Sequence, residues 1–129
     1  MKHPNILVVE DNETNLYLVR FLLEQAGMTV THVENGLECL AAVASQEPDL
    51  ILMDLLMPVM DGFETAQRLQ RDEKTRSIPI IASSAYAQRD HQQRAMESGF
   101  CHYIAKPFDP MTFVDTVRRY LPERPESAE

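Results

Sequence analysis

The chain has 129 residues, the usual length of one domain, and 44% of them are hydrophobic, which is enough for a folded core. Its 20 acidic and 12 basic residues give a net charge of −8, and this balance argues against direct binding of nucleic acid or of an anionic membrane. No apolar run is long enough to span a bilayer, and the segment 1–5 does not have the composition of a secretory signal. The two cysteines, Cys39 and Cys101, are not arranged as CxxC, so a reduced, cytoplasmic setting is expected.

Short apolar runs alternate with segments of helical periodicity along the whole chain. The runs that predict strands are 6–9, 29–33, 50–53, 78–82 and 103–105. The apolar residues at helical spacing are Leu16, Val19, Leu23 and Ala26, then Leu37, Leu40, Ala41 and Ala44, then Phe63, Ala66 and Leu69, and finally Phe113, Val114, Val117, Tyr120 and Leu121. A further, very polar helix is expected over 90–98, closed by Gly99. Five strands alternating with five helices predict an α/β fold with a parallel sheet and helices on both faces.

The apolar content of the strands predicts their order in that sheet. Strands buried on both faces are apolar throughout, as 6–9, 50–53 and 78–82 are, whereas edge strands such as 29–33 alternate. The pattern predicts a doubly wound sheet in the order 2-1-3-4-5. In that order the first and third strands are neighbours, and ligands bind beyond their carboxyl ends.

Residues able to carry chemistry follow four of these strands. Glu10 and Asp11 follow the first strand, Asp54 ends the third, Ser84 follows the fourth and Lys106 follows the fifth. Each of them alone is an ordinary surface residue. Because the carboxyl ends of parallel strands share one edge, their coincidence predicts one pocket that holds three carboxylates, a hydroxyl and an ammonium group.

These residue types suit a metal-assisted phosphoryl transfer. Two carboxylates about 4 Å apart repel each other by roughly 4 kcal/mol at an effective dielectric constant near 20, and a divalent cation removes that repulsion. All-oxygen ligands favour Mg²⁺. Asp54 could then attack phosphorus and form an acyl phosphate, with Lys106 as a second positive charge and Ser84 as a hydroxyl donor to the phosphoryl group.

Four motifs carry a resemblance to a known family. They are ILVVEDN at 6–12, DLLMPVMDG at 54–62, ASSA at 82–85 and YIAKPF at 103–108. In this order and spacing the chain resembles, over about 5–121, the receiver domains of two-component response regulators, and especially stand-alone cell-cycle phosphorelay regulators and hybrid-kinase receivers. The resemblance implies a flavodoxin-like receiver fold over 1–122, with 123–129 as a flexible tail or the start of a linker.

The resemblance also implies a metal site. Asp54 matches the phosphoacceptor of the family, and Asp11, Asp54 and the main-chain carbonyl of Leu56 match the ligands of Mg²⁺, for which Mn²⁺ can substitute. Glu10 matches the first acidic position, which acts on the metal through water. It stands where many members have aspartate, so the water shell of the metal is expected to differ.

Further positions match the phosphate contact and the switch of the family. Lys106 matches the lysine that contacts phosphate, and its bond to Pro107 matches one that is cis in family members. Ser84 and Tyr103 match the switch pair: Ser84 is expected to move toward the phosphoryl group and Tyr103 to turn into the space that it leaves.

The resemblance implies signalling through protein contacts, not conventional enzyme catalysis. A histidine kinase or a histidine phosphotransfer protein would donate the phosphoryl group, and a protein target would bind the face of the fourth helix, fifth strand and fifth helix. The chain would catalyse its own phosphorylation and slow autodephosphorylation, as a monomer or a weak phosphorylation-dependent dimer. The donor would meet the first helix, where Tyr17, Leu18, Phe21 and Leu22 form either an exposed apolar patch or part of the core.

Leu56 and Tyr86 match positions that tune the access of water to the phosphoryl group. Leu56 is apolar where many members carry a polar side chain, so we expect a slower than average loss of phosphate.

Three other classes of protein share part of this pattern. A haloacid-dehalogenase-type phosphatase needs a second acid two residues after Asp54, where Leu56 stands. A flavin module needs a phosphate loop after the first strand, where Glu10 and Asp11 would repel phosphate instead. A receiver-like interaction module that never takes phosphate remains open, and so does the question of whether the chain is complete or part of a larger protein.

Overall fold

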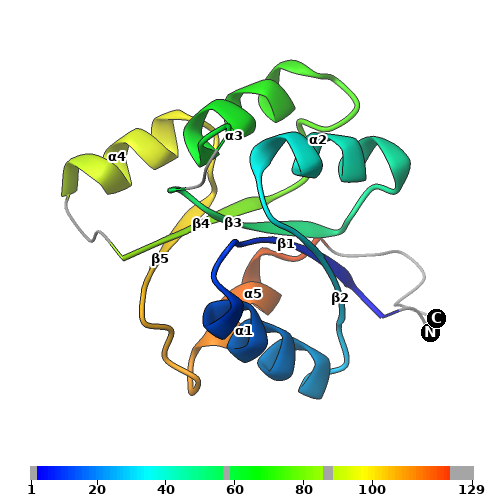
Figure 1. Cartoon of the computed structure of the whole chain (residues 1–129), viewed down its shortest axis with the longest axis vertical. Helices are drawn as coiled ribbons and strands as arrows, with labels where there is room; N and C mark the ends of the chain where they lie inside the picture. The colour runs from blue at the N-terminus through cyan, green and yellow to red at the C-terminus, as the bar shows by residue number, and fades with distance from the viewer. Residues whose placement is uncertain (1–2, 57–58, 86–88, 123–129) are drawn as a thin grey trace.

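The predicted parallel sheet is present in the computed structural model, which describes residues 3–56, 59–85 and 89–122 (Figure 1). The strands are β1 (Asn5–Val9), β2 (Thr29–Val33), β3 (Leu50–Asp54), β4 (Ile80–Ser84) and β5 (His102–Ala105). The helices are α1 (Glu13–Gln25), α2 (Gly36–Ser45), α3 (Gly62–Arg71), α4 (Arg89–Glu97) and α5 (Phe113–Tyr120). All strand pairs are parallel and the order is β2-β1-β3-β4-β5, which confirms the predicted order 2-1-3-4-5.

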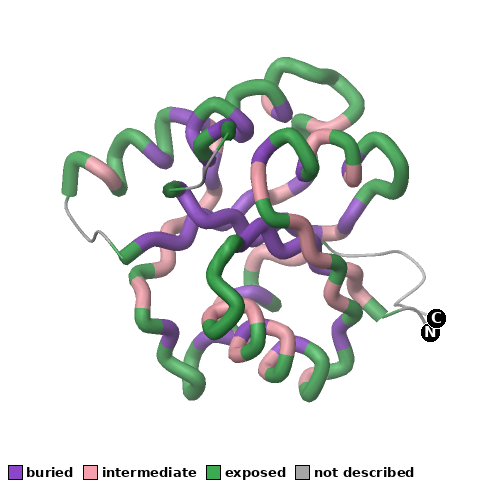
Figure 2. The backbone as a smooth tube through the Cα atoms, viewed as in Figure 1, coloured by how far each residue is buried: buried purple, intermediate pink, exposed green. Residues whose placement is uncertain are grey.

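Two apolar layers enclose the sheet, and successive residues of a central strand point into opposite layers. In β1, Ile6 packs with α1 and α5, whereas Leu7 packs with α2 and α3. This double burial is the reason why β1, β3 and β4 are apolar without interruption. The central strands are buried and the helices show exposed outer faces in Figure 2. None of the helices in the described parts of the chain is long and apolar enough to cross a membrane.

The fourth strand begins two residues later than predicted. The predicted strand 78–82 starts within a turn, in which the Ile78 N–H donates to the carbonyl of Thr75. Pro79 has no N–H for a ladder, although its carbonyl accepts from the N–H of Ile51. The strand runs from Ile80 to Ser84. Ser84 is thus the last residue of β4 and is buried there, whereas the sequence pattern placed it after the strand.

The buried face of α2 also differs from the prediction. Its buried residues are Gly36, Cys39 and Val43, whereas Leu37 is 50% exposed. A Cβ on Gly36 would lie 2.9 Å from the carbonyl oxygen of Met60, so α2 makes its close approach to the segment before α3 through this glycine. Burial raises the pKa of the Cys39 thiol to about 12, which makes this cysteine an inert core residue.

Of the four apolar residues of α1 for which the sequence allowed either an exposed or a core position, two are exposed and two are partly buried. Tyr17 and Phe21 are 74% and 51% exposed, whereas Leu18 and Leu22 are partly buried against the layer that also contains Val19. The buried stripes predicted for α3 and α5 are present, and α4 buries only Ala95. Gly99 follows α4 with a positive φ of 107°, as expected for a glycine that ends a helix. Tyr86 and the tail 123–129 lie outside the described residues.

Candidate functional site

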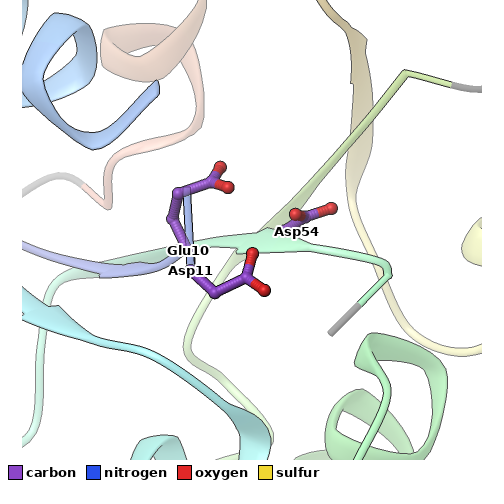
Figure 3. Close-up of side chains that lie close together, drawn as sticks. All are labelled: Glu10, Asp11 and Asp54. Carbon is purple, nitrogen blue, oxygen red and sulfur yellow. The ribbon is translucent and has the colours of Figure 1, made fainter. Parts of the chain in front are cut away.

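Three carboxylates meet beyond the ends of β1 and β3 (Figure 3). Glu10 and Asp11 follow β1, and Asp54 is the last residue of β3. One carboxylate oxygen of each residue lies within 4.8 Å of the others, and Glu10 and Asp54 are buried whereas Asp11 is exposed. The parallel pairing of β1 with β3 sets these strand ends side by side, as the sequence predicted. An all-oxygen set of this kind fits a hard divalent cation such as Mg²⁺.

Lys106 bridges two of the carboxylates. Its Nζ lies 3.0 Å from Glu10 Oε1 and 3.2 Å from Asp54 Oδ2. The Lys106 N–H donates to the carbonyl of Ser84, which fixes the start of this loop to the end of β4. The peptide bond between Lys106 and Pro107 is cis, as the resemblance implied. The ammonium group thus compensates part of the negative charge of the acidic cluster.

Main-chain hydrogen bonds hold Glu10 at the end of β1. Its N–H donates to the carbonyl of Val33, and its side-chain Oε2 accepts from the N–H of Asn12 at 3.3 Å. His32 Nε2 donates to the carbonyl oxygen of Glu10 at 2.7 Å. No spacing of residues in the sequence predicts this contact, because it depends on the pairing of β1 with β2.

Asp54 is buried, and its carboxylate accepts a hydrogen bond from the main chain. The N–H of Leu56 donates to Asp54 Oδ1 at 3.2 Å. Burial raises the pKa of Asp54 to about 6, the charge of Lys106 opposes this rise, and the charge of Glu10 adds to it. The negative form of Asp54 therefore depends on nearby positive charge.

Gly62 is a residue of the site that we did not single out in the sequence. A Cβ on it would lie 2.9 Å from the carbonyl oxygen of Asp54 and 2.9 Å from Leu55 Cα. Its N–H donates to the carbonyl of Leu55. Only glycine lets α3 begin against the end of β3.

The predicted switch residues lie on neighbouring strands. Ser84 is buried at the end of β4, beside Ala105 in the register of β5. The ring of Tyr103 packs against the layer of α2 and α3. Its hydroxyl is shielded from solvent and has no hydrogen-bond partner among the residues that the structure describes. Leu56, which follows the acidic cluster, is 48% exposed.

Known proteins are similar to this chain in sequence and in fold. A sequence model of the response regulator receiver domain matches residues 6–118. The chain is 38% identical over 117 residues to the polar-differentiation response regulator DivK of Brucella anthropi, and the match covers 91% of this chain and 95% of DivK.

Two solved structures have the same fold. The receiver domain of the sensor histidine kinase PA1611 from Pseudomonas aeruginosa, solved with magnesium in its active-site cleft, aligns with a TM-score of 0.85 and 32% identity. That alignment covers 92% of this chain and 98% of the PA1611 receiver domain. The chemotaxis response regulator CheY4 of Vibrio cholerae aligns with a TM-score of 0.87 and 28% identity, over 93% of this chain and 100% of CheY4.

The sheet order and the acidic cluster beyond β1 and β3 define a CheY-like signalling domain. The chain belongs to the response regulator receiver domain family of two-component phosphorelays.

Proposed function

We propose that this receiver domain accepts a phosphoryl group on Asp54 from the phosphohistidine of a histidine kinase or of a histidine phosphotransfer protein. The observation that carries the proposal is the contact of buried Asp54 with Lys106, 3.2 Å from Nζ to Oδ2, within the cluster that also contains Glu10 and Asp11. Charged side chains are seldom buried unless they are paired, and here two buried carboxylates share the ammonium group of one mostly buried lysine.

The transfer is a substitution at phosphorus. An Oδ atom of Asp54 attacks the phosphorus atom, a P–O bond forms, and the P–N bond to the histidine breaks. The electron pair of that bond stays on the imidazole nitrogen, which takes up a proton. Lys106 stabilises the negative oxygens of the transferring group through its positive charge.

Asp11, Asp54 and the main-chain carbonyl of Leu56 would hold the Mg²⁺ or Mn²⁺, and Glu10 would act on it through water. The bound cation supplies positive charge that offsets the repulsion between the carboxylates and the incoming phosphoryl group. Glu10 differs from the aspartate of many members, and its longer side chain reaches Lys106 directly. We infer that Glu10 also orients the lysine.

The phosphoryl group would change the face formed by α4, β5 and α5. Ser84 would donate its hydroxyl to a phosphoryl oxygen, and this would stabilise the inward position of the Tyr103 ring, which the ring already occupies in this structure. The packing of the Tyr103 ring against the layer of α2 and α3 supports this role, because the core accommodates the ring in its inward position. A Tyr103→Ala variant that is phosphorylated normally and still binds the target protein fully would contradict it.

The donor would bind at α1, where Tyr17 and Phe21 expose their rings. We propose that the receiver domain comprises residues 1–122 and is located in the cytoplasm. It would act through protein partners, without direct contact to nucleic acid or membrane. It would be a monomer or a weak phosphorylation-dependent dimer.

The proposal is tested by intact mass after incubation with acetyl phosphate and Mg²⁺. We expect one phosphoryl adduct on the wild type, dependent on Mg²⁺ and absent from Asp54→Asn. Asp49→Asn removes another carboxylate, just before β3 and at the opposite end of that strand from the acidic cluster; it is the matched control and should be phosphorylated as the wild type is. A folded wild-type protein that takes up no phosphoryl group would instead favour the phosphate-independent interaction module.

A further inference from the structure

A polar groove of about 440 Å³ separates α3 from α4, outside the acidic cluster. It is lined by Asp61, Phe63 and Glu64 at the start of α3, by Arg68 and Arg71 further along that helix, and by Arg94 of α4. The two helices lie on the same side of the sheet in Figure 1. Three arginines in one groove are notable in a chain whose net charge is −8.

The carboxylates of the groove already have partners. Glu64 Oε2 accepts from Arg68 at 3.0 Å, and Asp61 Oδ1 accepts the N–H of Glu64 at the start of α3. Arg71 and Arg94 form no ion pair with any residue in the described ranges 3–56, 59–85 and 89–122. Two guanidinium groups therefore line the groove without an internal counter-charge.

Arg94 is held in place by an aromatic ring. Its guanidinium carbon lies 3.9 Å from the centroid of the Phe63 ring, and Phe63 itself is buried. A guanidinium stacked on a ring face keeps its N–H edges free, and those edges match the geometry of a carboxylate. Because the stacking fixes the side chain, less rotamer entropy is lost when a ligand binds.

We propose that this groove binds an acidic segment of a partner protein, with carboxylates of that segment paired to Arg71 and Arg94. The two arginines line the same groove, so one extended segment with two acidic side chains can reach both. A phosphate dianion concentrates its charge at one point beside Asp61 and Glu64, whereas the two carboxylates of one segment lie apart, so these acidic residues repel the segment less at each contact. The charge complementarity thus favours an acidic peptide segment.

The groove adjoins the site but does not depend on its chemistry. Phe63 follows Gly62, whose close contact with the main chain of Asp54 fixes the start of α3. The arginines line the groove in the unmodified protein, so the inference goes beyond the proposed function and can be tested without phosphorylation of Asp54.

The probe is a hexaglutamate peptide, titrated into the full chain at 0.1 M salt and followed by NMR of the arginine Nε–H groups and amides. At that ionic strength charges interact over about 10 Å, so the groove and not the net charge decides binding. We expect shifts at Arg71 and Arg94. Arg71→Gln should weaken binding about threefold, and Arg71→Gln with Arg94→Gln about tenfold, in line with exposed ion pairs.

Arg76→Gln with Arg119→Gln is the matched control, because it removes the same charge from exposed arginines outside the groove and should leave binding within about twofold. Glu64→Gln frees Arg68 from its internal partner and should tighten binding about threefold, a gain that a misfolded variant cannot mimic. Absence of binding to the wild type, equal loss in the control pair, or stronger shifts at Arg71 and Arg94 with inorganic phosphate than with the peptide would each overturn the proposal.

Discussion

Glu10 and Lys106, which are 96 residues apart in the sequence, form a partly buried ion pair with Nζ 3.0 Å from Oε1. The same Nζ lies 3.2 Å from Asp54 Oδ2, so one ammonium group serves two carboxylates. The lysine side chain is only 12% exposed. Because little water reaches these charges to screen them, the charge of each group strongly affects the other two.

Removing this lysine should destabilise the protein when no divalent cation is present. Lys106→Met leaves Glu10 and Asp54 buried without a counter-charge, and we expect the free energy of unfolding to fall by about 2–4 kcal/mol in EDTA. Added Mg²⁺ should restore part of this loss. Urea unfolding measures both effects, and Lys74→Met, at an exposed lysine, is the control. A variant as stable as the wild type in EDTA would contradict the account of the ion pair.

The raised pKa of Asp54 predicts a pH-dependent cost to stability. Its folded-state pKa is about 6 against an ordinary value of 3.8, so the folded protein prefers the protonated form. The stabilisation by protonation is complete below about pH 4 and is lost as the pH rises through 6. Without metal, Asp54→Asn should therefore be more stable than the wild type at pH 7.5, by about 1–2 kcal/mol, and the difference should vanish near pH 4. A difference that is independent of pH would rule this cause out.

Gly62→Ala should disturb the site and the fold together. Its Cβ would press on main-chain atoms of Asp54 and Leu55, which cannot move as a side chain can. We expect a loss of about 1–3 kcal/mol of stability and a slower rate of phosphorylation by acetyl phosphate. Gln67→Ala, at an exposed position of the same helix, should change neither quantity appreciably. Equal behaviour of the two variants would show that α3 can shift away from β3 at no cost.

Removing the exposed rings of α1 should slow phosphotransfer from the donor and leave the stability of the fold nearly unchanged. Tyr17→Ala and Phe21→Ala should each change stability by less than about 1 kcal/mol, because these side chains are mostly exposed. Phosphotransfer from a phosphohistidine donor should fall about tenfold, as expected for aromatic contacts central to an interface. Met111→Ala truncates an exposed apolar side chain elsewhere and should transfer at the normal rate. Normal transfer to both α1 variants would move the donor surface away from this helix.

The lifetime of the phosphoryl group should depend on Leu56, which is 48% exposed beside Asp54. Leu56→Asn offers a polar group that can orient an attacking water, so the half-life of the phosphorylated protein should shorten. Leu37→Asn makes the same exchange at an exposed position of α2 and should leave the half-life unchanged. A half-life that is equal or longer in Leu56→Asn would refute the idea.

The sheet and the acidic cluster were predictable because they depend on local patterns. Continuous apolar runs identified the central strands, and parallel strands necessarily bring their ends to one edge, where Glu10, Asp11 and Asp54 meet.

The errors have local causes. The fourth strand was placed too early because Pro79 lies inside an apolar run, and sequence periodicity does not register its missing N–H. The face of α2 was wrong because apolar residues surround the helix and two stripes fit equally well, until the close approach at Gly36 selects one.

Other features depend on tertiary contacts. The hydrogen bond from His32 to the carbonyl of Glu10 and the stacking of Arg94 on Phe63 join segments that have no shared motif. Neither contact could be predicted before the strands and helices were placed.

The central claim, that Asp54 itself takes the phosphoryl group, is tested most directly by borohydride reduction after treatment with acetyl phosphate and Mg²⁺. Reduction converts an aspartyl phosphate to homoserine, and peptide sequencing by mass spectrometry identifies its position. We predict homoserine at position 54, formed only when Mg²⁺ and the phosphodonor are both present. Homoserine at position 11, or none in a folded protein that carries a phosphoryl group, would contradict the assignment.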